Sequence, residues 1–181
     1  IGSGVVVKIK NQYFIFSASH VFDDIGEFQV LVGGGDNNEI LSLLGDRFST
    51  KRGISGTHID DPIDASVFHI QSELSERIKS IALTLSDFDF SVVKNAKLIY
   101  FASGFRANKS KKIGNGIKSK CEIFPSIEIS ENDYITFNID PKIHIALASG
   151  KQVIIHGNWH LAPNLEGISG GAIISIPGVS I

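Results

Sequence analysis

Short runs of β-branched and aromatic residues alternate with turn-forming residues along the first quarter of the chain. Residues 5–10 and 13–18 are two such runs separated by a polar pair, which predicts a β-hairpin. Residues 27–32 and 39–44 flank a glycine-rich stretch at 33–38, which predicts a second hairpin with a flexible tip. We therefore expect this part of the chain to form an antiparallel sheet.

The rest of the chain continues the strand-like pattern, interrupted by a polar loop and by a stretch of helical character. Residues 51–61 form a polar loop, and an apolar strand starts at Asp64 and runs to Ile70. Residues 72–80 have helical character with a solvated face, and we expect 76–81 to link two halves of the protein. Further strands are predicted at 81–85, 96–102, 134–139, 143–147, 153–156 and 172–176. Many short strands with almost no helix predict an all-β sandwich or barrels.

The composition of the 181 residues, 43% hydrophobic and 20% charged, is that of a globular protein. A net charge of −2 gives no global reason to expect nucleic acid or an acidic membrane surface as the main partner. Cys121 is the sole cysteine, so an intramolecular disulfide is excluded, which suits a reducing compartment. We expect neither a signal segment nor a membrane helix, because no basic-then-apolar run opens the given residues and no apolar run reaches the roughly 20 residues that cross a membrane. We expect a cytoplasmic, bacterial protein.

Residues 106–120 carry six lysine and arginine side chains around two glycines. We interpret this segment as a solvated loop, with a local patch for nucleic acid or an acidic peptide as the alternative. Because the segment contains no aromatic side chain on which bases would stack, nucleic acid is disfavoured as a partner.

A glycine-framed serine near the end of the chain is the candidate nucleophile. Gly167, Gly170 and Gly171 surround Ser169, and residues with so little side chain let backbone N–H groups converge on one side of the hydroxyl. The alternative is a glycine-rich turn that merely leads into the strand predicted at 172–176. The interpretation therefore depends on a base and an orienting acid elsewhere in the chain.

Among the six histidines, His20 is the best candidate for the base. It lies on a turn with small neighbours, just past a predicted strand. His69 and His144 fall inside apolar strands and are interpreted as packing residues, and His58 lies in a polar loop without a framing motif.

A zinc site at the remaining two histidines is disfavoured. His156 and His160 are four residues apart, a spacing that brings side chains together on a helix, and Gly157 makes a helix improbable there. A third ligand such as Glu166 would also be needed. A calcium loop at 33–38 is disfavoured because its acidic residues are too few and too irregularly spaced. We predict neither a metal nor a cofactor.

Asp64 is favoured as the orienting acid over the loop carboxylates Asp60 and Asp61. A carboxylate that heads an apolar strand is partly buried and needs a partner such as an imidazole N–H. The chain order His, Asp, Ser is one of three known chain orders for a catalytic arrangement of these three residue types. The subtilisin order is excluded because no acidic residue precedes His20. The hydrolase elbow is excluded because no Asp, Glu or His follows Ser169.

Three segments resemble the motifs of the trypsin/chymotrypsin-type serine peptidases. SASHVF at 17–22 resembles the histidine motif, DASVF at 64–68 the aspartate motif, and GISGG at 167–171 the serine motif. GSG at 2–4 is similar to the opening of the bacterial high-temperature-requirement branch, whose motif style is the closest. Three motifs in the right order, spread over nearly the whole chain, are far more specific than any one of them.

The resemblance implies two six-stranded antiparallel Greek-key barrels at 1–75 and 82–181, joined by a linker at 76–81. His20 and Asp64 would come from the first barrel and Ser169 from the second. His20 would take the proton of Ser169, Asp64 would orient the imidazolium, and the backbone N–H groups of Gly167 and Ser169 would bind the oxyanion. The implied activity is that of a serine endopeptidase that cleaves protein or peptide substrates through an acyl-enzyme intermediate.

Two positions depart from the family's pattern. Ile168 stands where secreted trypsins carry the aspartate that pairs with a newly cleaved N-terminus, so zymogen cleavage is not expected. Pro163 stands where trypsin has the aspartate of its specificity pocket. The resemblance thus implies a substrate pocket at Pro163, Asn164 and Glu166 that has no preference for Lys or Arg.

The family's last strands would follow Ile181, and the chain opens at Ile1 without any methionine. We therefore expect a piece of a longer protein, whose second barrel is incomplete or is completed by a further domain or a regulatory partner. A cytoplasmic protease also needs restraint, which a partner that orders the loops around the cleft would provide.

Two other functions stay open. The first is a catalytically silent, protease-like module that binds peptides in the same cleft. The second makes Cys121 the nucleophile, with Lys118 and Lys120 stabilising its thiolate, although Cys121 lacks a glycine frame.

Overall fold

The computed structural model describes residues 2–23, 25, 29–33, 39–88, 98–114, 116–155 and 158–177. Over these residues the chain is mostly β, with two short α-helices, and this confirms the β-rich class predicted above. No helix within these ranges is long and apolar enough to cross a membrane.

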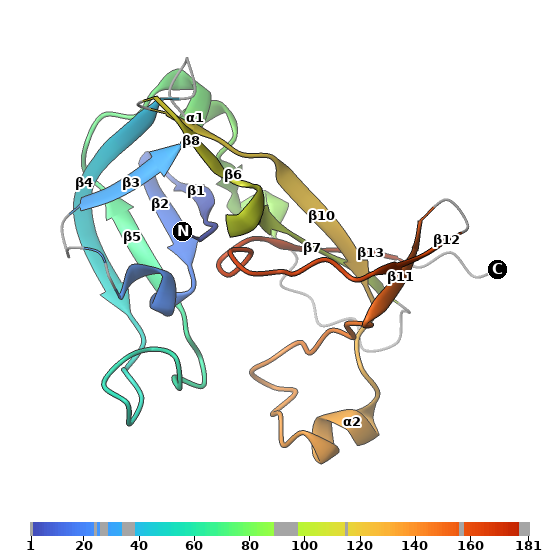
Figure 1. Ribbon diagram of the computed structural model, residues 1–181. Coiled ribbons are helices and arrows are strands. Elements are labelled where there is room, and N and C mark those ends of the chain that lie inside the picture. The colour runs from blue at the N-terminus through green and yellow to red at the C-terminus, as the bar shows by residue number, and fades with distance from the viewer. Residues whose placement is uncertain are drawn as a thin grey trace.

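Six strands form the sheet of the N-terminal half, in the order β3-β4-β5-β2-β1-β6 (Figure 1). They are β1 (Val5–Ile9), β2 (Gln12–Ser17), β3 (Gln29–Gly33), β4 (Ile40–Ser49), β5 (Ser66–Ile70) and β6 (Leu83–Thr84). Both predicted hairpins are confirmed, β1 with β2 and β3 with β4. Of the tip predicted at 33–38, Gly33 ends β3 and residues 34–38 lie outside the described residues. Strand β6 adds to β1 in parallel, whereas the other pairs are antiparallel.

The core of this half is an apolar cluster on one face of the sheet, with Phe68 fully buried in it. On β5, buried Ser66, Phe68 and Ile70 alternate with partly buried residues, as the two-residue period of a strand requires. The cluster consists of Ile15, Phe22, Val30, Leu43, Phe68, Ile70, Leu74 and Ile78.

The helix α1 (Glu76–Ser80) closes this core and occupies most of the segment predicted as a linker. The hydroxyl of Ser75 caps it by accepting from the N–H of Ile78, whose side chain is buried. The chain then pairs with the first sheet again through β6. The division of the chain into domains stays a prediction.

The C-terminal half contains a three-stranded sheet in the order β10-β7-β13 and two hairpins. The sheet is made of β7 (Leu98–Phe105), β10 (Cys121–Ser126) and β13 (Ile173–Pro177); the hairpins are β8 (Lys111–Ile113) with β9 (Gly116–Lys118) and β11 (Gln152–Ile155) with β12 (Asn158–Leu161). The described pairings form open sheets, so the two closed barrels stay a prediction.

Two predicted strands in this half are wrong. Residues 134–139 were expected to be a strand, but α2 (Glu131–Thr136) covers the first three of them. Ser130 and Asp133 form a capping box in which each side chain accepts from the other's backbone N–H, and this stabilises a helix start. A turn at 141–143 precedes residues without regular structure, and within the strand predicted at 143–147 only Leu147 makes an isolated bridge, to Glu128.

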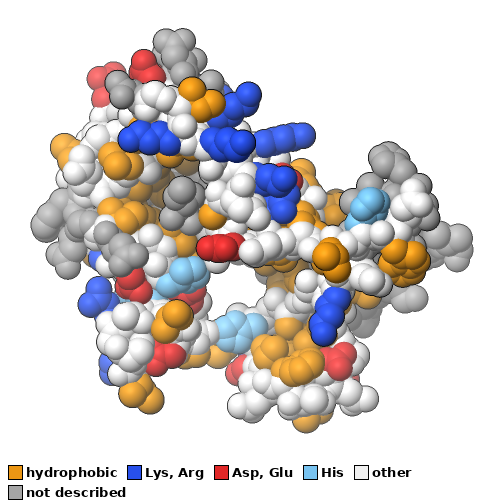
Figure 2. All heavy atoms as spheres, in the orientation of Figure 1, with side chains coloured by type: hydrophobic (Ala, Val, Ile, Leu, Met, Phe, Trp, Pro, Cys, Tyr) orange, Lys and Arg blue, Asp and Glu red, His pale blue; other side chains and the backbone are white. Residues whose placement is uncertain are grey.

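Residues 106–120 are more ordered than the predicted solvated loop. Arg106 is 9% exposed and forms a two-fold ion pair with Glu122, with contacts of 2.5 and 2.7 Å. Beyond the short 3-10 helix η3 (Ala107–Lys109), strands β8 and β9 form a hairpin in which Lys111 faces Lys118. Lysine and arginine side chains gather on the face around β8 (Figure 2).

Replacing Phe68 with alanine is expected to lower the free energy of unfolding by about 3–5 kcal/mol, because a fully buried ring leaves a cavity in the core. Urea titration followed by circular dichroism measures this change. Phe48→Ala is the matched control, since Phe48 lies on the neighbouring strand β4 and is 63% exposed, and its loss should stay below about 0.5 kcal/mol. Equal losses for the two variants would contradict the placement of the core.

Candidate active site

His20 lies in the short 3-10 helix η1 (Ser19–Phe22), which follows β2 almost directly. The preceding side chain, Ser19, is fully buried, and its hydroxyl lies 2.8 Å from the hydroxyl of Ser66 on β5. The start of the turn is therefore fixed against the sheet. The side chain of His20 projects from this fixed point and is 39% exposed.

The carboxylate of Asp64 holds His20 through two contacts. The backbone N–H of His20 donates to Oδ1 over 2.9 Å, and ring Nδ1 lies 2.5 Å from Oδ2. Because Nδ1 faces a carboxylate, we assign the ring proton to Nδ1 of neutral His20, which leaves the lone pair on Nε2. This is the tautomer in which a histidine acts as a general base toward a hydroxyl. The structure thus brings together the predicted base and the predicted acid.

The sequence analysis expected Asp64 to head the strand, but β5 starts two residues later, at Ser66. Its backbone has a φ of 48°, in the left-handed region that costs a non-glycine residue about 1–2 kcal/mol. The Asp64 carbonyl accepts from the N–H of Ser19 over 3.2 Å. Asp64 is therefore held to this turn both by its backbone carbonyl and by its side chain. Backbone strain that is held in this way is typical of functional sites.

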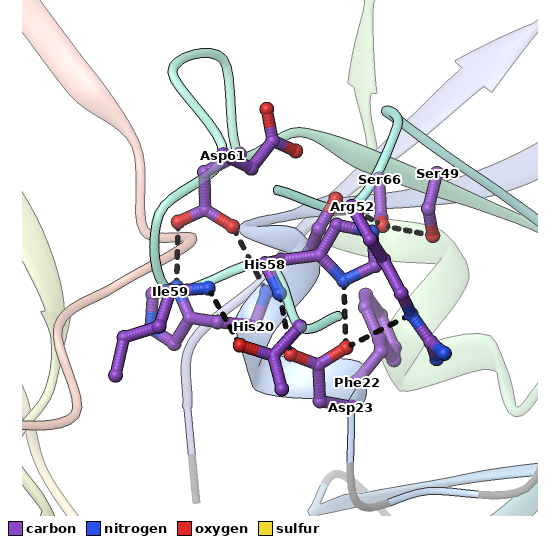
Figure 3. A network of polar contacts seen from close by, with 12 residues as sticks. His20, Phe22, Asp23, Ser49, Arg52, His58, Ile59, Asp61 and Ser66 are labelled. Carbon is purple, nitrogen blue, oxygen red and sulfur yellow. Dashed lines mark hydrogen bonds and ion pairs between the residues drawn. The ribbon is translucent and has the colours of Figure 1, made fainter. Parts of the chain in front are cut away.

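A second histidine–aspartate pair, His58 with Asp23, lies in the same polar network (Figure 3). The N–H of His58 donates to Oδ2 over 2.9 Å, and Nδ1 lies 2.6 Å from Oδ1. The other ring nitrogen lies 3.0 Å from the carbonyl oxygen of Thr50, and the ring is 4% exposed. Nε of Arg52 lies 3.9 Å from the same Oδ1 of Asp23. Sequence reasoning missed this pair because its members lie in separate loops and belong to no motif.

The two rings of these pairs differ in what they can do. Burial lowers the pKa of His58, but the hydrogen bonds to Asp23 and to the Thr50 carbonyl outweigh burial and raise it above its ordinary 6.5. The bond from the His58 backbone N–H contributes most to lowering the pKa of Asp23. With acceptors facing both nitrogens, His58 is a buried imidazolium without a free lone pair. We conclude that His58 is structural.

The His58 pair supports the strained segment at Asp64 through Thr50. The hydroxyl of Thr50 donates to the carboxylate of Asp61 and accepts from the N–H of Ala65 over 3.1 Å, while its carbonyl faces His58. Asp61 is therefore not the solvated loop carboxylate that was expected, since it is 9% exposed and also accepts from the N–H of Ile63. The network fixes the backbone on both sides of Asp64.

The turn that carries Ser169 presents two free backbone N–H groups. The carbonyl of Glu166 accepts from the N–H of Ala107 over 2.9 Å, and that of Ile168 accepts from the N–H of Gly171 over 2.8 Å. Because C=O and N–H point in opposite directions across a trans peptide, the N–H groups of Gly167 and Ser169 point away from the N–H groups that bind these two carbonyls. Neither N–H donates to any group in the described part of the chain. Both are available to an anion.

The serine turn docks directly on the segment that precedes His20. The N–H of Ser3 donates to the carbonyl of Ser169 over 2.9 Å, and the hydroxyl of Ser17 donates to the carbonyl of Ser3 over 2.7 Å. Gly170 has a φ of 84°, and a Cβ at this position would overlap Ser17 Oγ and the Ser3 carbonyl. Gly170, the neighbour of Ser169, thus packs closely against Ser17, and Ser17 is three residues before His20.

Within the described ranges, no hydrogen bond joins the Ser169 hydroxyl to the ring of His20. Such bonds are often long before substrate binds and tighten in the complex.

The residues predicted to line a substrate pocket lie in the turn just before the serine turn. Asn164 and Glu166 are exposed, and the N–H of Glu166 donates to the side-chain oxygen of Asn164 over 3.0 Å. The pocket at Pro163, Asn164 and Glu166 stays a prediction. A cavity of about 450 Å³ lies elsewhere, beside His58.

The remaining candidates lie apart from this arrangement. His69 stacks on Phe14 with ring centroids 4.9 Å apart, which confirms its packing role. Cys121 is exposed at the start of β10. His160 lies on β12, whereas His156 falls outside the described residues. The described residues contain no group of three or more His, Cys, Asp or Glu that would hold a metal ion.

Neither a scan against protein-family models nor a search of curated proteins finds a match for this chain.

Gly170→Ala is expected to push the serine turn away from Ser17 and to lower the free energy of unfolding by more than about 1–2 kcal/mol, the ordinary cost of a positive φ. Gly56→Ala is the matched control, because Gly56 has a φ of 78° and nothing within 4 Å of an added Cβ. Urea unfolding of both variants measures the difference. Equal losses would contradict the close approach at Gly170.

The His58 pair predicts how stability depends on pH. Because the pKa of His58 is raised on folding, its protonated form stabilises the fold below about pH 6.5, and this contribution is lost as pH rises through the raised pKa. The lowered pKa of Asp23 acts in the opposite sense, so its contribution is present above 3.8 and is lost in acid.

The free energy of unfolding, measured by urea titration, should therefore decline between about pH 6 and about pH 9. His58→Gln should remove this decline, and His69→Gln should retain it. An unchanged decline in His58→Gln would contradict the imidazolium assignment.

Proposed function

We propose that this chain is a serine endopeptidase of the trypsin/chymotrypsin type, built on two antiparallel β-barrels. The observation that carries the proposal is the His20–Asp64 pair, whose exposed ring keeps Nε2 free of hydrogen bonds within the described ranges, together with the packing of the serine turn against Ser3 and Ser17, three residues before His20. The nucleophile is Ser169, the base is His20, and the acid that orients it is Asp64.

In the first half of the reaction the Ser169 oxygen attacks the carbonyl carbon of the scissile peptide bond while His20 Nε2 takes the hydroxyl proton. Asp64 stabilises the imidazolium that forms. The carbonyl oxygen becomes an oxyanion, which the N–H groups of Gly167 and Ser169 bind. The imidazolium then gives its proton to the leaving nitrogen as the C–N bond breaks, and an acyl-enzyme remains.

In the second half a water molecule attacks the acyl carbon and gives a proton to His20. The bond to the Ser169 oxygen breaks, and His20 returns a proton to that oxygen. The net reaction is hydrolysis of one peptide bond, and it needs no metal or cofactor.

The substrate is a protein or peptide in an extended conformation. Gly170 and Gly171 leave room for its backbone beside Ser169, and the turn at Pro163, Asn164 and Glu166 lies next to the bond that is cut. Without an aspartate at Pro163, this pocket would not select Lys or Arg.

A catalytically silent peptide-binding module is the alternative. The observation that favours it is the lack of a hydrogen bond between Ser169 and His20 within the described residues. Such a module would bind peptides with the same N–H groups and leave them intact.

Labelling with a fluorophosphonate separates the two functions, because the reagent phosphonylates an activated serine. The parent protein should be labelled at Ser169, as mass spectrometry of the adduct would show. Ser169→Ala should abolish labelling, and His20→Ala should slow it by about 10⁴-fold or more. Ser175→Ala, which removes an exposed serine six residues further along, should react like the parent.

A parent protein that is not labelled, and that leaves a denatured test protein uncut, would rule out the peptidase in favour of the binding module. Labelling that persists in Ser169→Ala would place the nucleophile elsewhere.

A further inference from the structure

Ser3 is a buried polar residue at which three segments of the chain meet. It is 6% exposed and lies just before β1, whereas its partners come from β2, from β7 and from the serine turn. Burial of a hydroxyl is unfavourable unless the hydroxyl is fully hydrogen-bonded, so the partners of Ser3 indicate what it is there to hold.

The side chain of Ser3 both donates and accepts. Its hydroxyl donates to the carbonyl of Gly167 over 2.9 Å and accepts from the N–H of Phe105 over 2.8 Å. The backbone N–H of Ser3 donates to the carbonyl of Ser169 over 2.9 Å. One residue thus binds two carbonyls of the serine turn and ties them to β7.

The carbonyl of Gly167 belongs to the peptide plane that joins the two N–H groups proposed to bind the oxyanion. The N–H of Gly167 lies in the plane before it, and the N–H of Ser169 lies in the plane after it. The middle plane is held at both ends, because its N–H, on Ile168, donates to the Leu165 carbonyl over 3.0 Å. Rotation of a planar peptide moves both of its neighbours, so the Ser3 hydroxyl restrains both oxyanion donors.

The packing around Ser3 leaves little room for other arrangements. A Cβ added to Gly104 would lie 2.7 Å from the Ser3 hydroxyl oxygen and 3.1 Å from the Ile168 carbonyl oxygen. The absence of a side chain at Gly104 therefore lets β7 approach Ser3 and the serine turn together.

We propose that Ser3 is a positioning residue for the oxyanion site: its hydroxyl fixes the Gly167–Ile168 peptide so that the N–H groups of Gly167 and Ser169 point at the developing oxyanion. The inference rests on the proposed peptidase function. Donors of this kind stabilise the transition state more than the bound ground state, so losing their alignment lowers the rate constant of the chemical step and leaves binding unchanged.

The test is the inactivation kinetics of Ser3→Ala with a fluorophosphonate, measured over a range of reagent concentrations to separate kinact from KI. We expect kinact to fall by about 10- to 100-fold, less than the roughly 10²–10³ typical of deleting a donor, with KI unchanged within about two-fold. Hydrogen–deuterium exchange should be faster at the N–H groups of Ile168 and Gly171 in the variant.

Tyr134→Phe is the matched control. It also removes a buried hydroxyl that accepts from a backbone N–H, that of Ala146 over 2.8 Å, but this hydroxyl lies on α2. The control should lose stability and keep the parent's kinact. If Ser3→Ala fails to fold, Ser3→Cys takes its place, since a thiol of similar size donates more weakly.

A kinact in Ser3→Ala equal to that of the parent would overturn the positioning role and leave the peptidase proposal intact. An equal fall of kinact in Tyr134→Phe would overturn it as well, because a loss of stability alone would then explain the slower inactivation. A parent that does not react overturns the peptidase proposal, and the role of Ser3 falls with it.

Discussion

The anchoring of the serine turn to Ser3 is the interaction on which the candidate site depends. It joins residues 164 positions apart in sequence, Ser3 and Gly167, and it joins the three-stranded sheet of the C-terminal half to the six-stranded sheet of the N-terminal half. Ser3 leads into β1, which pairs with β2, and β2 leads into the turn that carries His20. Holding Ser3 therefore sets the position of the serine relative to the histidine.

The two histidine–aspartate pairs show how surroundings decide the role of one chemical group. His20 and His58 are each held at the backbone N–H and at Nδ1 by an aspartate. The ring of His58 is 4% exposed and has an acceptor at both nitrogens, so it serves as a buried cation that braces the Asp64 segment. The ring of His20 is 39% exposed, and its Nε2 has no hydrogen-bond partner in the described part of the chain.

The two halves of the molecule differ in how firmly they hold their part of the site. His20 and Asp64 stand on a sheet with a well-packed apolar core. The serine turn precedes β13, whose Ile173 and Ile174 are about half exposed. Because that sheet buries little apolar surface, the geometry of the serine turn depends on hydrogen bonds to Ser3 and on the close approach at Gly170. The two N–H groups proposed to bind the oxyanion are thus set by long-range contacts.

The sequence by itself determined the hairpin of β1 and β2, and it singled out His20, Asp64 and Ser169, because strand propensity and short motifs are written in neighbouring residues. It missed α2, since alternating apolar residues at 134–139 concealed the capping box at Ser130. Only the tertiary structure decided that Asp23 pairs with His58, that Asp64 lies before β5 in a left-handed conformation, and that Ser3 holds the serine turn. These features arise from contacts between distant segments, and local sequence patterns carry no information about which buried polar groups will meet.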